Sequence, residues 1–165
     1  MEIIKLSKYW AKAEVFSARI VWIFSVIEIT AAIGFCYWGK TAIAKAFIWP
    51  LLIAGLFLTL VGAGLYLTNH PRIPRFINEN RPNPAAFVQK TIQRTAESRE
   101  EMALLFKILP AIIILAVLVI LLFPHFLWRA IAIAAIITAA FLMVVDSNTK
   151  GRNNTFYTQL SSFKL

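Results

Sequence analysis

Glu28 is the residue whose type and position most clearly predict chemistry in this chain. It lies near the middle of an apolar stretch that runs from Arg19 to Trp38. An ionisable group at the centre of a bilayer costs about 2.5–3.5 kcal/mol on insertion scales, so such groups rarely face lipid. No lysine or arginine lies at the same depth in the other apolar stretches. We therefore expect the carboxyl group to be protonated, or bonded to hydroxyl groups, inside a bundle of helices.

Hydroxyl side chains surround this position in the predicted bundle. Ser25 shares the helical face of Glu28, and Thr30, Thr59 and Thr138 are candidate hydrogen-bond partners. One hypothesis is a proton- or cation-coupled site, and the other is an interhelical hydrogen bond that holds the helices together. A single glutamate in the first of four apolar helices resembles the small multidrug resistance transporters, which implies proton-coupled transport. The long central loop and the long tails of this chain depart from that family.

Four apolar segments position Glu28, and they decide the class of the protein. The chain has 165 residues, of which 59% are hydrophobic and 15% charged, whereas a soluble domain is about 25% charged. The segments cover residues 19–38, 44–67, 104–123 and 128–145. Each exceeds the roughly 17 residues that cross a bilayer, and backbone groups in hydrocarbon must be paired within a helix. The sequence predicts an all-α, integral membrane four-helix bundle.

The basic residues predict how the bundle faces. Three of the seventeen, Lys40, Lys45 and Arg129, lie in the connections on one side, and the other fourteen lie on the opposite side. The positive-inside rule then predicts that both termini and the central loop lie on the cytoplasmic side of a bacterial inner membrane. The net charge of +9 is explained by basic residues that set the membrane topology and contact anionic lipid. We therefore expect no binding of nucleic acid.

The chain divides into five regions. Residues 1–18 show a basic amphipathic pattern, which favours a helix at the membrane surface or an ordinary charged lead-in to the first span. Residues 19–67 and 104–145 form two transmembrane hairpins, and residues 146–165 are a polar tail that we expect to be weakly structured. Residues 68–103 form the cytoplasmic loop between the hairpins.

The second half of this loop predicts a helical extension of the third span. Asn83 and Pro84 have the pattern of an N-cap followed by a first-position proline. No break follows, so we expect one long helix from Pro84 to Phe123, with a kink at Pro110; a frayed loop is the alternative. Basic residues of this region are expected to contact anionic lipid or an acidic protein partner. They are Arg72, Arg75, Arg81, Lys90, Arg94 and Arg99.

Small residues in the second and fourth segments indicate where helices approach one another closely. They are Gly55, Gly62 and Gly64, and Ala130, Ala134, Ala135 and Ala139. We expect packing within the bundle, and a contact between copies in a homo-oligomer is the alternative interpretation of the alanines.

The sequence contains no phosphate-binding loop, no metal-ligand spacing and no nucleophile with an adjacent base. We therefore expect neither a cofactor nor an enzymatic activity. The favoured hypothesis is an accessory or scaffold protein whose cytoplasmic loop docks a partner or a membrane assembly. The alternatives are a small proton-coupled transporter or pore subunit that uses Glu28, and a membrane immunity or toxin-related protein.

Overall fold

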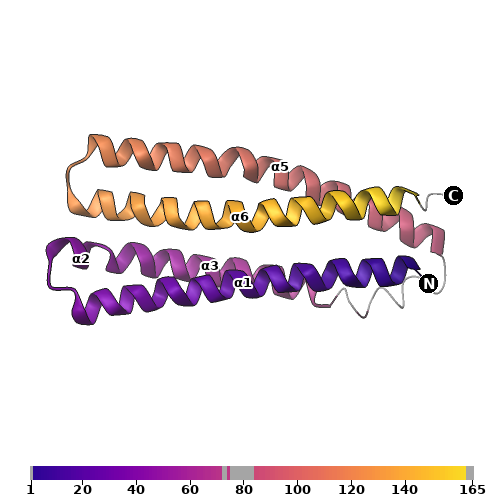
Figure 1. Cartoon of the computed structure of the whole chain (residues 1–165), viewed down its shortest axis with the longest axis horizontal. Helices are drawn as coiled ribbons and strands as arrows, with labels where there is room; N and C mark the ends of the chain where they lie inside the picture. Colours follow the sequence, from indigo (N-terminus) through magenta and orange to yellow (C-terminus); the bar gives the residue numbers. More distant parts are fainter. Residues whose placement is uncertain (1, 72–73, 75–83, 163–165) are drawn as a thin grey trace.

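The chain folds into long helices that lie side by side, and the computed structural model describes residues 2–71, 74 and 84–162. Every element of these residues is an α-helix, as the apolar segments predict. The elements are α1 (Glu2–Trp38), α2 (Ala42–Ala46), α3 (Ile48–Asn69), α5 (Pro84–Leu122) and α6 (Phe126–Ser162). The start of α1 and the end of α6 lie at the same end of the bundle (Figure 1).

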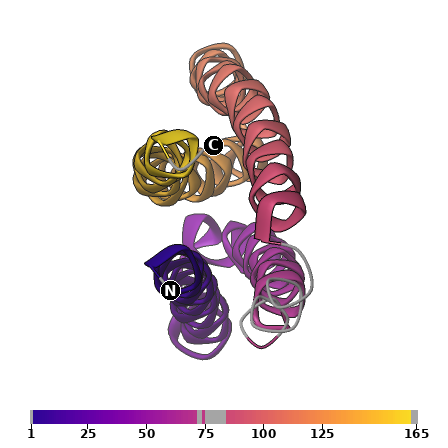
Figure 2. The same cartoon turned by 90° about the vertical axis from the view of Figure 1, so that its right-hand side faces the viewer.

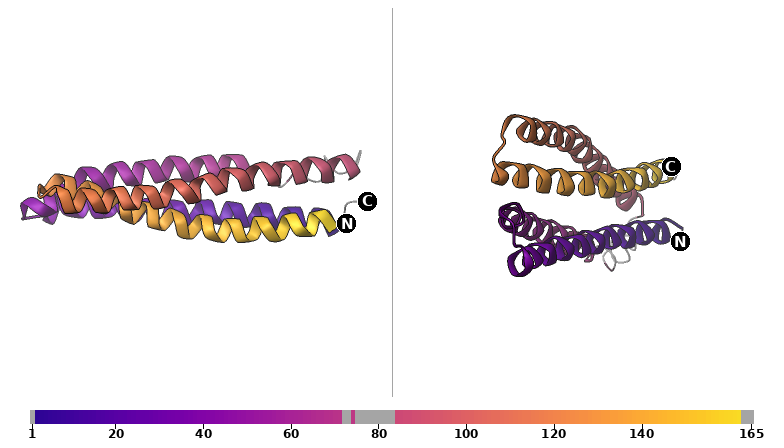
Figure 3. Two further views of the ribbon diagram at one scale, coloured as in Figure 1. Left: turned by 90° about the horizontal axis from the view of Figure 1, so that it is seen from above. Right: turned by 60° about the vertical axis from the view of Figure 1, so that its left-hand side comes forward.

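Two helical hairpins make up the bundle. Helix α1 packs along α3, and α5 packs along α6. Helix α6 also contacts α1, α2 and α3, whereas α5 contacts no described helix other than α6. Figure 3 shows the hairpins as separate layers, and Figure 2 shows α6 lying between α5 and α1. Helix α6 is therefore the element that joins the two hairpins.

The two ends of the bundle differ in polarity. We call the polar end the part formed by residues 2–18, 84–103 and 146–162, and the turn end the part formed by residues 38–47 and 122–128. Between them lie the apolar segments. In the described part of the chain four helices are long and apolar enough to cross a membrane, as expected for a multi-pass membrane protein.

Local sequence explains where these helices begin and end. The Gly39 amide donates to the Phe35 carbonyl oxygen at 3.0 Å and closes α1. The Thr41 hydroxyl accepts from the Ala44 amide at 3.2 Å and caps α2. Pro50 lies in the first turn of α3 and Pro84 is the first residue of α5, positions where the missing proline N–H leaves no helical hydrogen bond unmade.

The predicted long helix from Pro84 is confirmed as α5, which ends one residue early, at Leu122. The alternative prediction, a frayed loop, is wrong for residues 84–103, because they lie inside this helix. Pro110 also lies within α5, and Figure 1 shows that the path of α5 bends along its length.

The prediction of a helix that lies at the membrane surface is wrong. Residues 2–18 continue the first apolar segment as one helix, α1, so they extend along the bundle axis instead of lying across it. Trp10, Ala11, Phe156 and Leu160 form a buried cluster between this part of α1 and the end of α6. Trp10 is thus covered by protein, and Leu6 packs partly buried against the same cluster.

The prediction of a weakly structured C-terminal tail is also wrong. Helix α6 runs through the end of the fourth apolar segment to Ser162. Thr149, Asn153, Phe156 and Leu160 are all buried and recur every three or four residues. This spacing makes one face of a helix, and α1 and α5 supply the surface that covers it.

Candidate functional site

Glu28 points into the bundle from α1. The residue is 3% exposed, and its Oε1 accepts a hydrogen bond from the Thr138 hydroxyl of α6 at 2.8 Å. The same hydroxyl lies 2.9 Å from the Ala134 carbonyl oxygen, one turn earlier in α6. Glu28 Oε2 is buried and has no hydrogen-bond partner among the described residues. The site is thus a carboxyl group held between the two hairpins by one hydroxyl.

The other predicted hydroxyls lie elsewhere. Ser25 Oγ and Thr59 Oγ1 are 2.7 Å apart, and both lie within hydrogen-bond distance of the Gly55 carbonyl oxygen, at 2.7 and 3.0 Å. They therefore join α1 to α3 beside Glu28 without bonding to it. Thr30 lies on an exposed face of α1. Of the predicted set, the structure brings only Thr138 to the carboxyl group.

The small residues divide into packed and open positions. A Cβ atom at Gly55 would lie 2.6 Å from Ile29 Cγ1, and one at Gly62 would lie 2.6 Å from Trp22 Cδ1. A Cβ at Gly64 would have no atom within 4 Å. In α6, Ala130, Ala134 and Ala139 are buried inside the bundle, and Ala135 is half-buried.

The basic residues of the central loop lie mainly outside the described part of the structure. Arg72, Arg75 and Arg81 fall on residues that it does not describe. Arg94 and Arg99 belong to α5, and Lys90 is exposed on the same helix. The contact with lipid or an acidic partner stays a prediction.

A partly buried ion pair at the polar end was not predicted. Glu14 of α1 is 6% exposed, and its Oε1 lies 3.5 Å from Arg152 Nη2 of α6. The same nitrogen donates to Ser17 Oγ at 2.6 Å and to Thr149 Oγ1 at 3.0 Å. These hydroxyls help to satisfy the partly buried guanidinium, whereas Arg152 Nε is buried and has no hydrogen-bond partner among the described residues. The pair fixes α1 and α6 in register outside the apolar segments.

Asn153 connects three helices at the same end. Its side chain is fully buried, and its Oδ1 accepts a hydrogen bond from Trp10 Nε1 of α1. Its Nδ2 donates to Ser98 Oγ of α5 at 3.2 Å. The Trp10 ring also stacks on Phe156, with ring centroids 5.1 Å apart. The three- and four-residue spacing of the buried α6 positions was the signal in the sequence that could have revealed this network.

A polar cavity of about 400 Å³ lies where α1, α3, α5 and α6 meet at the polar end. Glu14, Glu97 and Asp146 line it, together with hydroxyl and amide side chains. Burial raises the pKa of the Asp146 carboxyl group, because desolvation disfavours its charged form. The cavity thus places three carboxyl groups at the boundary between the polar end and the apolar segments.

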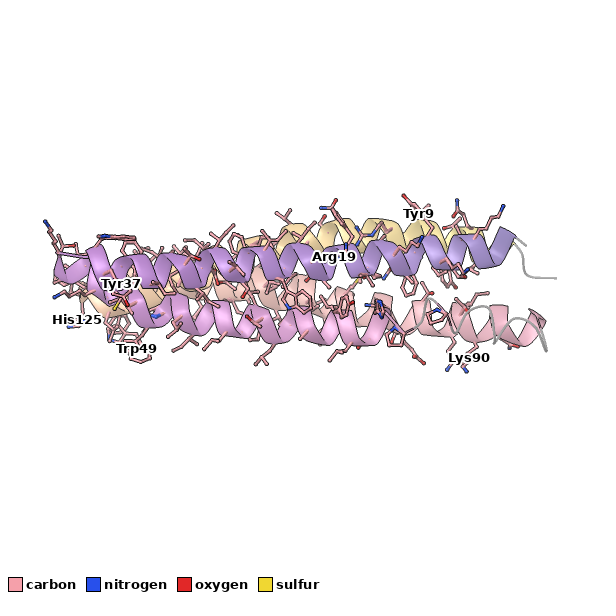
Figure 4. All side chains as sticks on the ribbon, turned by 90° about the horizontal axis from the view of Figure 1, so that it is seen from below. Tyr9, Arg19, Tyr37, Trp49, Lys90 and His125 are labelled. Atoms are coloured by element: carbon pink, nitrogen blue, oxygen red, sulfur yellow. The ribbon has the colours of Figure 1, made fainter. Side chains whose placement is uncertain are left out.

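An apolar groove of about 880 Å³ lies between α3 and the α5–α6 hairpin. Trp49 and Phe57 line its α3 side, Ile108 and Ile112 its α5 side, and Thr138 belongs to its lining on α6. The residue that binds Glu28 therefore also faces this groove. Figure 4 shows Trp49 near the turn end of the molecule and Lys90 at the polar end.

Comparison with protein-family models, with characterised proteins and with solved structures finds no match to this chain.

Proposed function

We propose that this protein is a non-enzymatic accessory or scaffold protein of a bacterial inner membrane, with its polar end in the cytoplasm. In this proposal the four apolar segments anchor the chain, and the polar end docks a protein partner or a membrane assembly. The observation that carries the proposal is the buried Asn153, which bonds α1 to α6 and α6 to α5 outside the apolar segments.

Anchoring alone does not require such a structure. An anchor needs about 20 apolar residues for each helix, yet α1, α5 and α6 have 37, 39 and 37 residues. The added turns have their own buried cluster around Trp10 and Phe156 and their own ion pair between Glu14 and Arg152. A rigid surface of this kind supports recognition, because little conformational entropy is lost when a partner binds it.

The distribution of charge supports the cytoplasmic orientation. Lys40, Lys45 and Arg129 lie in or beside the two connections at the turn end, and the other fourteen basic residues lie in the sequence before residue 20, between residues 70 and 108, or after residue 149. Cysteine labelling tests it with His70→Cys and His125→Cys in a chain that carries Cys36→Ser. A membrane-impermeant reagent added to intact cells is expected to label position 125 and not position 70. Labelling of position 70 alone would reverse the orientation.

Docking is tested by photo-crosslinking in living cells. A photoreactive residue replaces Asn154, Thr155 or Thr158, which are exposed on α6 at the polar end. Tyr37 and Trp128, exposed at the turn end, are the matched controls. We expect the positions at the polar end to crosslink to a different protein, so that the mass of the adduct is not a multiple of the mass of this chain. Adducts confined to the turn end would contradict the proposal.

Two variants separate docking from chemistry at Glu28. Asn153→Ala is expected to weaken the polar end and to abolish the adducts, because Trp10 and Ser98 lose their common partner. Glu28→Gln keeps the shape and the hydrogen-bond acceptor but removes titration, and it is expected to leave the adducts unchanged. The opposite pattern, with loss in Glu28→Gln alone, would reject the scaffold function.

One observation favours proton-coupled transport as a second candidate. Glu28 Oε2 is buried without a partner, and Thr138, which binds the other oxygen, faces the apolar groove. An intramembrane carboxyl group is a functional candidate by default. The test is proton flux in proteoliposomes with an enclosed pH-sensitive dye. Flux that Glu28→Gln abolishes, while insertion stays normal, would favour this candidate, and flux equal to that of empty vesicles would reject it.

A further inference from the structure

Helix α1 leaves one face uncovered along the whole bundle. At the polar end this face consists of Lys5, Tyr9, Lys12, Phe16 and Arg19, all exposed, and it is called here the α1 seam. Tyr9 is 74% and Phe16 59% exposed. The residues alternate by four and three positions, the spacing at which one helix packs along another. The same spacing of exposed residues continues through the apolar segment to Tyr37.

Helix α5 has a matching uncovered face. It consists at the polar end of Lys90, Gln93, Glu97, Glu100 and Leu104, all exposed, and it is called here the α5 seam. The three- and four-residue spacing again continues through the apolar segment, to Leu121. Within the described chain α5 packs against α6 alone, so the opposite side of α5 has no covering helix.

The two seams carry one pair of opposite charges, Lys12 and Glu100, at about the same height, and the same register sets Arg19 level with Lys107. Asn153 bonds to both Trp10 and Ser98, so these two residues lie level with each other along the bundle. Helices α1 and α5 both run from the polar end to the turn end. Lys12 and Glu100 each lie two residues further along, about 3 Å at 1.5 Å per residue. The same register sets Tyr9 level with Glu97 and Phe16 level with Leu104.

These seams cannot meet within one chain. Among the described residues, α1 and α5 do not pack against each other. A bilayer gives every copy the same orientation, so a neighbouring copy presents its α5 parallel to α1. We propose that copies of this chain associate side by side, with the α1 seam of one copy packed against the α5 seam of the next and Lys12 facing Glu100.

Charge selects this pairing over a symmetric one. None of Lys5, Lys12 and Arg19 has an acidic partner within the described residues. Two α1 seams packed in parallel would set Lys12 against Lys12, and like charges at such positions destabilise a helix pair. The proposed contact joins different surfaces, so it repeats into a ring or an open row. It goes beyond the docking function, which does not depend on it.

Cysteine crosslinking in native membranes tests the register. The reporter pair is Phe16→Cys in one copy and Leu104→Cys in another, both with Cys36→Ser, and Thr158→Cys on exposed α6 replaces Leu104→Cys as the control. Oxidation is expected to join the reporter pair and not the control pair. A chain that carries both reporter cysteines is expected to give crosslinked oligomers larger than a dimer. Absence of the crosslink would overturn the proposal.

Charge reversal then tests the pairing itself. With the reporter cysteines in place, Lys12→Glu in the copy that presents α1 is expected to lower the crosslink yield roughly two- to fivefold, the size of an exposed ion pair. Glu100→Lys in the other copy is expected to restore the yield. Failure of the double reversal to restore it, or equal crosslinking of Phe16→Cys to itself, would overturn the proposed contact.

Discussion

Replacing each glycine of α3 by alanine tests how closely α1 and α3 approach. A Cβ at position 55 would lie 2.6 Å from Ile29 Cγ1, 3.1 Å from the Ser25 carbonyl oxygen and 3.2 Å from the Ile29 amide nitrogen. The Ile29 side chain can rotate, but the other two atoms belong to the α1 backbone. Gly55→Ala therefore requires the two helices to move apart. At Gly64 the added methyl group meets no atom within 4 Å.

The magnitude follows from comparing the two variants. Alanine gains about 0.8–1 kcal/mol of helix propensity over glycine at either position. Overpacking a tight contact costs about 1–3 kcal/mol. Because the propensity gain is common to both, the difference in unfolding free energy between Gly64→Ala and Gly55→Ala isolates the packing cost, about 1–3 kcal/mol. Gly62→Ala is expected to fall between them, because the Trp22 ring must move from its contact with Gly62 and its hydrogen bond to the Thr59 carbonyl oxygen.

The assay is unfolding of the purified protein in mixed detergent micelles, followed by tryptophan fluorescence. Wild type and all three variants are compared at equal detergent composition, after membrane insertion has been verified. We expect Gly64→Ala to be at least as stable as wild type and Gly55→Ala to be the least stable. Equal stability of these two variants would refute the close contact between α1 and α3.

Three further outcomes follow from single contacts. Asn153→Ala is expected to destabilise the polar end by about 1–3 kcal/mol, because Trp10 Nε1 loses its Asn153 acceptor and Ser98 Oγ loses its Asn153 donor. Faster amide exchange at the polar end, absent in the exposed control Asn154→Ala, would show it. Thr138→Val is expected to cost about 0.6 kcal/mol, typical of an interhelical bond in a membrane, and this cost should vanish when Glu28 is replaced by alanine. Asp146→Asn is expected to raise the melting temperature at neutral pH. Burial raises the pKa of the Asp146 carboxyl group, so the folded protein binds the proton more tightly and its stability falls as the pH rises from 3.8 through the raised value. The stability of Asp146→Asn should not fall over this pH range, and at low pH it should equal the stability of wild type.

Three features could be predicted because local physics imposes them. Apolar segments of about 20 residues form helices in hydrocarbon whatever surrounds them, since their backbone groups have no other partners. The unbroken pattern after Pro84 likewise predicted α5, because no residue in it interrupts a helix before Pro110. Burial of Glu28 follows from the cost of exposing a carboxyl group to lipid.

The tertiary structure alone decided which surfaces meet. Trp10 and Asn153 are separated by 143 positions in the chain, and their contact depends on how α1 and α6 are rotated about their axes. The spacing of the α6 residues indicates a helix with one buried face, but it does not say which helix covers that face, so the packing of the tail and of the lead-in was not predicted. The same rotation brings Thr138 to Glu28 while Thr59 bonds to Ser25, and it packs Gly55 while it leaves Gly64 open.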